Sequence, residues 1–76
     1  MGNNKIKTDF RGIYFSLEGK QHGKDKYICR DTETKEARAI IVWDTEWSSY
    51  RVEFVRNVQF AKTAVQDLAE FMEQLK

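Results

Sequence analysis

A change in hydrophobic period near Asn57 is the feature that most constrains the fold. Residues 12–18 and 50–56 alternate apolar and polar side chains, as half-buried strands do. Beyond Asn57 the apolar side chains recur every three or four positions, which is the period of an amphipathic helix. This apolar stripe comprises Ala61, Ala64, Val65, Leu68, Phe71, Met72 and Leu75. The chain is therefore predicted to fold as an α+β protein, with a sheet followed by one helix.

Two further strands are expected between these segments, over residues 26–30 and 37–43. The tripeptide Asp-Thr-Glu follows each of them, at positions 31–33 and 44–46, and starts a polar turn. Short turns favour antiparallel pairing of consecutive strands. The prediction is a four-stranded antiparallel β-meander followed by one C-terminal amphipathic helix packed on one sheet face, in the order ββββα.

The helix is expected to begin between residues 58 and 63. Asn57 could cap a helix that starts at the next residue, or Thr63 and Gln66 could form a capping box. Residues 10–76 are assigned to a single domain, and residues 1–9 to a flexible or covering N-terminal segment. The predicted core comprises Phe15, Leu17, Tyr27, Ile41, Trp43, Val52, Phe54, Ala64, Val65, Leu68, Phe71 and Met72.

Composition limits the classes of function that the chain can have. The 76 residues are 41% hydrophobic and 33% charged, with a net charge of +1, as in a single globular domain. A domain this small buries only about 60% of its unfolded surface, which leaves little volume for a walled active site. The longest apolar run, residues 39–43, is too short to span a bilayer, and Met1–Lys5 begins no apolar signal sequence. With Cys29 as the single cysteine, we expect a cytoplasmic protein without disulfides or a membrane anchor.

Three features of the sequence are candidate sites of chemistry. His22 lies in a loop over residues 19–23, and no partner for general-base catalysis is visible, so it is interpreted as an exposed loop residue. Cys29 lies within a strand and is interpreted as a small buried apolar residue. Acidic residues gather in the turns, at Asp31, Glu33, Glu36, Asp44 and Glu46. They lack the glycine-bearing calcium loop, so we expect no metal, no cofactor, no small-molecule substrate and no enzyme activity.

Basic and aromatic residues are concentrated in the N-terminal hairpin. Residues 1–30 carry seven Lys or Arg against three Asp or Glu. A sheet that interleaves such residues can contact phosphates and stack on bases. The candidate nucleic-acid-binding residues are Tyr14, Lys20, Lys24, Lys26 and Arg30. Residues 27–35 loosely resemble the strand and turn of the arm-binding domains of phage-type integrases and of AP2-type plant domains, which implies DNA binding, although the near-neutral charge and the acidic turns depart from those families.

One helix covers one face of a sheet, so the other face is expected to be a binding surface. An apolar patch with a charged rim is typical of such a surface. The alternation assigns to this patch Tyr14, Ile28, Ile40, Val42 and Val55. Trp47, within a polar turn, is a further candidate anchor. The alternative is that Met1–Phe10 folds back and covers the face with Ile6 and Phe10.

These observations predict a small non-catalytic interaction module. We expect it to bind a protein partner, or a second copy of itself, through the exposed sheet face. In size and style it resembles the small accessory proteins of phages and other mobile elements. The alternative is a nucleic-acid-binding module that uses the basic, aromatic N-terminal hairpin.

Overall fold

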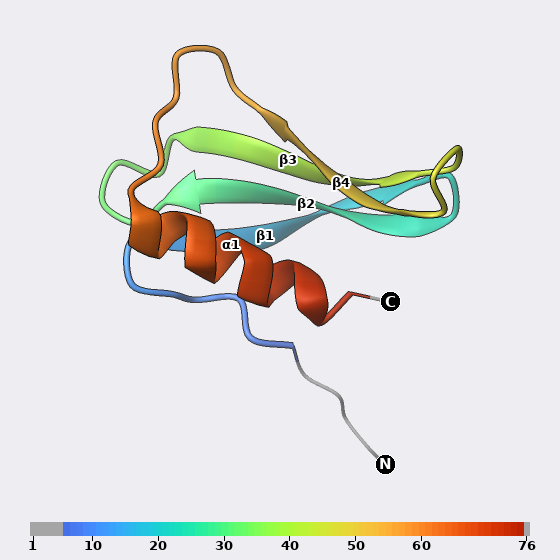
Figure 1. Cartoon of the computed structure of the whole chain (residues 1–76), viewed down its shortest axis with the longest axis horizontal. Helices are drawn as coiled ribbons and strands as arrows, with labels where there is room; N and C mark the ends of the chain where they lie inside the picture. The colour runs from blue at the N-terminus through green and yellow to red at the C-terminus, as the bar shows by residue number, and fades with distance from the viewer. Residues whose placement is uncertain (1–5, 76) are drawn as a thin grey trace.

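The structure is a computed structural model, and it describes residues 6–75. Four strands precede one helix (Figure 1): β1 (Ile13–Gln21), β2 (Lys24–Asp31), β3 (Ala37–Asp44), β4 (Ser49–Phe54) and α1 (Lys62–Glu73). The strands lie in the sheet in their sequence order, and every neighbouring pair is antiparallel. The predicted ββββα meander is confirmed. Within residues 6–75, no helix is long and apolar enough to cross a membrane.

The connection between β1 and β2 is shorter than the predicted loop over residues 19–23. β1 runs to Gln21 and β2 begins at Lys24, so the turn consists of two residues. His22 and Gly23 both have positive φ, 57° and 77°, and such turns match the twist of the strands that they join. Gly19, with φ 139°, lies at a register shift in the β1–β2 ladder. The predicted loop over residues 19–23 is therefore wrong, because its first three residues belong to the strand.

The start of α1 lies in the predicted range, but neither predicted cap is used. The residue before the helix is Ala61, and no side chain caps the helix there. Asn57 lies in a turn four residues earlier, where its φ is 62°. Thr63 is already the second residue of the helix, so it cannot act as the cap.

The hydrophobic core lies between α1 and one face of the sheet. The core cluster comprises Ile13, Phe15, Tyr27, Cys29, Ala39, Ile41, Leu68 and Phe71. Phe71 stacks on the Phe15 ring with 3.8 Å between centroids, and meets the Tyr27 ring edge-on at 5.1 Å. These contacts hold the helix against β1 and β2.

Three residues of the predicted core are exposed. Leu17, Phe54 and Val65 have exposed fractions of 62%, 56% and 50%. The 12 residues of α1 span about 18 Å, whereas the nine residues of β1 span about 30 Å. Figure 1 shows the strands extending past the C-terminal end of α1, so one helix cannot cover the whole face. Val65 lies on α1 itself, so its exposure comes from the side of the helix that it occupies. Trp43, Val52, Ala64 and Met72 are half-buried.

The chain before β1 runs alongside α1 (Figure 1) and is bonded to it. Lys7 and Gln74 exchange two hydrogen bonds: the Lys7 N–H donates to Oε1 at 2.8 Å, and Nε2 donates to the Lys7 carbonyl at 2.9 Å. The Arg11 guanidinium pairs with the buried Asp67 carboxylate at 2.7 Å and 3.2 Å, and this hydrogen bond holds the pKa of Asp67 below its usual value. These contacts fasten residues 6–12, which we call the strap, along one side of α1.

The contacts of the strap show which face of the sheet it covers. Ile6 and Phe10 pack against the core cluster on the helix side of the sheet. The Phe10 ring meets the Phe15 ring edge-on at 5.7 Å. These two residues therefore do not fill the patch on the opposite face, where the covering alternative would place them. The rest of that alternative, residues 1–5, lies outside the described part of the chain.

Candidate interaction surface

The sheet face opposite α1, which we call the open face, has an apolar centre. Ile28 of β2 and Ile40 of β3 are direct cross-strand partners there, and both are partly exposed. Ser16 of β1 lies beyond Ile28, and Glu53 of β4 lies beyond Ile40. One row across the sheet thus presents two isoleucines flanked by polar residues.

The other predicted residues of this face differ in how accessible they are. Val42 is only 3% exposed, although it is outside the core cluster. Its cross-strand partner is Arg51, and long side chains bury apolar neighbours beneath their stems. Val42 is therefore not available to a partner, contrary to the prediction. Tyr14 is partly exposed and lies under the Lys35 ammonium at 5.3 Å, whereas Val55 is 39% exposed just after β4.

The turn between β3 and β4 is fixed by one aspartate. Oδ1 of Asp44 accepts hydrogen bonds from the backbone N–H groups of Glu46 at 2.8 Å and Trp47 at 3.1 Å. Oδ2 accepts from the Arg51 guanidinium at 3.2 Å. The backbone hydrogen bonds and the arginine lower the pKa of the Asp44 carboxyl. Ser48 has φ 52°, which completes the turn.

The turn between β2 and β3 repeats this arrangement. Oδ1 of Asp31 accepts from the N–H groups of Glu33 at 2.8 Å and Thr34 at 3.0 Å, and Oδ2 pairs with Arg38 at 3.0 Å. Its pKa is lowered for the same reasons, and Lys35 has φ 68°. In both turns the arginine follows the aspartate by seven positions. The repeated Asp-Thr-Glu predicts the two turns but not the role of these arginines, although their common spacing from the aspartates is readable in the sequence.

We expect the pairing of Asp44 with Arg51 to make the fold sensitive to acid. Because the folded-state pKa of Asp44 is lowered, its stabilising contribution is present above the unfolded pKa, near 4, and is lost as the pH falls through the folded value. Asp44→Asn should lower the melting temperature at pH 7 and should flatten its decline below pH 4. Thr45→Ala in the same turn is the matched control. An unchanged melting temperature of Asp44→Asn at pH 7 would contradict the role of this pair.

Trp47 is the most exposed of the large apolar residues, at 71%. It lies in the β3–β4 turn, where the hydrogen bond from its N–H to Asp44 fixes its backbone. Trp43, by contrast, is half-buried and meets Tyr50 edge-on at 5.4 Å. Of the two tryptophans, Trp47 is thus the one that is free to contact a partner.

The structure divides the basic residues of the N-terminal hairpin between its two ends. The Lys24 ammonium lies over the Trp43 ring at 4.7 Å, at the start of β2. Arg30, near the end of the same strand, donates to the Lys35 carbonyl at 3.0 Å. Lys20 lies 4.0 Å from Asp25. Lys26 is partly exposed and lies opposite Gly19. Lys20, Lys24 and Lys26 are therefore near the β1–β2 turn, whereas Arg30 lies opposite Tyr14 at the other end of the hairpin.

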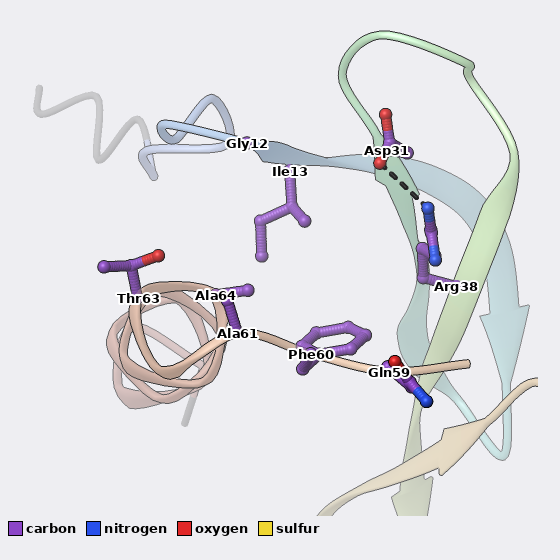
Figure 2. A pocket seen from close by; sticks show the side chains of 9 residues that line it. All are labelled: Gly12, Ile13, Asp31, Arg38, Gln59, Phe60, Ala61, Thr63 and Ala64. Atoms are coloured by element: carbon purple, nitrogen blue, oxygen red, sulfur yellow. Dashed lines mark hydrogen bonds and ion pairs between the residues drawn. The ribbon is translucent and has the colours of Figure 1, made fainter.

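A cavity of about 220 Å³ lies where α1 begins (Figure 2). Its lining residues are Gly12, Ile13, Asp31, Arg38, Gln59, Phe60, Ala61, Thr63 and Ala64. The charged side chains in it, Asp31 and Arg38, pair with each other, and Figure 2 shows that pair on one side of the space with the Ile13 and Phe60 side chains projecting from other sides. The two charged side chains of this cavity are therefore occupied by each other, and its other polar side chains are Gln59 and Thr63.

The remaining candidates for chemistry are placed apart. His22 is exposed at the tip of the β1–β2 turn. Cys29 is fully buried, and this burial raises the pKa of its thiol to about 11, which keeps the thiol protonated and unreactive at neutral pH. Among residues 6–75, no three histidine, cysteine or acidic side chains are grouped so as to hold a metal ion.

Comparisons with protein-family models, with curated proteins and with solved structures gave no match to this chain.

Proposed function

We propose that the protein is a non-catalytic module that binds another protein through the open face of its sheet. The observation that carries the proposal is the adjacent pair Ile28 and Ile40, which are partly exposed at the centre of that face. The strap supports it, because Ile6 and Phe10 pack against the core on the opposite side of the sheet and not over this pair.

The surroundings of the isoleucine pair fit a protein-binding surface. Arg30, Arg51 and Glu53 bring both signs of charge to its border, and a polar rim around an apolar centre is the usual anatomy of an interface. A rim of mixed sign favours a protein surface over the uniformly negative backbone of a nucleic acid.

Replacing Ile28 and Ile40 together by threonine tests this proposal. Threonine keeps the β-branched shape that strands favour but removes apolar contact area. We expect the double variant to remain folded, as judged by circular dichroism. Affinity capture with the wild type identifies the partner, and the purified partner is then mixed with each protein. The double variant should fail to bind this purified partner. Val65→Thr removes a similar apolar group from the exposed side of α1 and should retain that partner.

Two results would contradict the proposal. One is a double variant that binds the same partner with unchanged affinity. The other is a wild-type protein that retains nucleic acid with a strong dependence on salt, because such binding would indicate phosphate contacts instead.

A further inference from the structure

The two edges of the sheet differ in how much of their backbone is paired. At the β1 edge, the Thr8 carbonyl accepts a hydrogen bond from the Phe15 N–H at 2.9 Å, and Asp9 forms a bridge with Tyr14. The register shift near Gly19 further disturbs that edge, as bulges on natural edge strands do. β4 pairs only with β3 among the described residues, and it has no bulge, proline or glycine. The β4 edge is therefore open for a further strand.

The hydrogen bonding of β4 identifies which of its backbone groups are available. The Val55 N–H donates to the Arg38 carbonyl at 3.0 Å, so the backbone groups of Val55 point toward β3. Because backbone groups alternate in direction along an antiparallel strand, those of Arg51 and Glu53 also point toward β3. The N–H and C=O groups of Tyr50, Val52 and Phe54 therefore point outward from the sheet.

We propose that β4 pairs with β4 of a second copy, antiparallel, about a two-fold axis at Val52. The proposal is independent of the binding function of the open face. In this register Val52 pairs with Val52 of the second copy, and Tyr50 pairs with Phe54 of the second copy. The backbone N–H and C=O groups of these three residues point away from β3, so each pair can exchange two backbone hydrogen bonds.

The side chains of β4 are complementary to themselves in that register. Residues 50–54 read Tyr-Arg-Val-Glu-Phe: an aromatic, a positive charge, a valine, a negative charge and an aromatic. An antiparallel copy therefore places Arg51 opposite Glu53 and Tyr50 opposite Phe54, and both pairings stabilise neighbouring strands. Arg51 already contacts Glu53 in its own strand, so the four charges would alternate in sign.

The accessible aromatic surface at this edge supports the same partner. Phe54 is 56% exposed, although it lies on the helix face of the sheet and contacts the Phe60 ring edge-on at 5.3 Å. Pairing would place Phe54 next to Tyr50 of the second copy, a residue whose hydroxyl donates to the Asp25 carbonyl at 3.0 Å within its own sheet. It would also form one eight-stranded sheet with both helices on one side. The two open faces would then be contiguous, each about 19 Å wide across four strands.

Charge variants test the register directly. In Glu53→Arg every charge of the quartet is positive, and in Arg51→Glu every charge is negative, so we expect each dimer dissociation constant to rise at least about 10-fold. An equimolar mixture of the two variants restores opposite charges and should form a heterodimer. Sedimentation velocity and native mass spectrometry of the purified proteins read these outcomes.

A backbone variant provides a second test of the β4–β4 pairing, and this test remains usable if Arg51→Glu does not fold. Val52→Pro removes an N–H that points away from β3, so the variant should stay folded and become monomeric. Val52→Thr keeps that N–H and should remain dimeric. A wild type that is monomeric at millimolar concentration, or a mixture of the two charge variants that does not associate although both are folded, would overturn the proposal. So would a dimer that is lost in the Ile28 and Ile40 double variant but kept in Glu53→Arg, because that dimer would use the open face instead.

Discussion

Phe71→Ala is expected to lower the free energy of unfolding by about 3–5 kcal/mol, the usual cost of truncating a buried phenylalanine. A domain of 76 residues has a total stability of about 4–11 kcal/mol, so the variant should lose a large share of its stability. The physical reason is that Phe71 has no exposed surface and joins α1 to the rings of Phe15 and Tyr27. Urea denaturation followed by far-ultraviolet circular dichroism measures the loss.

Val65→Ala on the same helix is the matched control for this experiment. Val65 is 50% exposed, so its truncation should change the stability by less than about 1 kcal/mol. The apolar stripe in the sequence contains both residues and does not distinguish them. A loss below about 1 kcal/mol for Phe71→Ala, or equal losses for the two variants, would show that α1 does not dock through Phe71.

The order of elements was predictable because it is recorded in local patterns. Alternation marks strands such as residues 12–18, and the change of period after Asn57 marks the helix. The strap was not predictable in this way. Its contacts join Arg11 to Asp67 and Lys7 to Gln74, 56 and 67 positions apart, and no local period records such a pairing.

The candidate surface was predictable only in part, because alternation gives the face of a residue but not its neighbours. Ile28 and Ile40 were assigned to the exposed face, and they are partly exposed there. Val42 was assigned to the same face, but it lies opposite the long side chain of Arg51 and is buried. Exposure on a sheet therefore depends on the cross-strand register, which becomes known only when the strands are paired.

We expect Cys29 in the folded protein to react with iodoacetamide at pH 8 at least two orders of magnitude more slowly than in urea-unfolded protein. Burial raises the pKa of its thiol to about 11, against roughly 8.5 for a free cysteine, so the thiolate fraction at pH 8 is roughly 200-fold smaller. The thiol also has no exposed surface, so alkylation should report only on molecules that open. Mass spectrometry of quenched samples measures the rate.

The same thiol should make the fold sensitive to alkali. In the unfolded chain the Cys29 thiol loses its proton first, so between about pH 8.5 and 11 the unfolded state binds fewer protons and the free energy of unfolding falls as the pH rises. Cys29→Ala removes this contribution and should show a shallower decline in melting temperature over that range. The raised pKa values of Tyr27 and Tyr50, caused mainly by burial, add a further decline toward higher pH that the variant retains.

Equal alkylation rates in native and denatured protein would show instead that Cys29 is accessible, and the core between β2 and α1 would then have to be open.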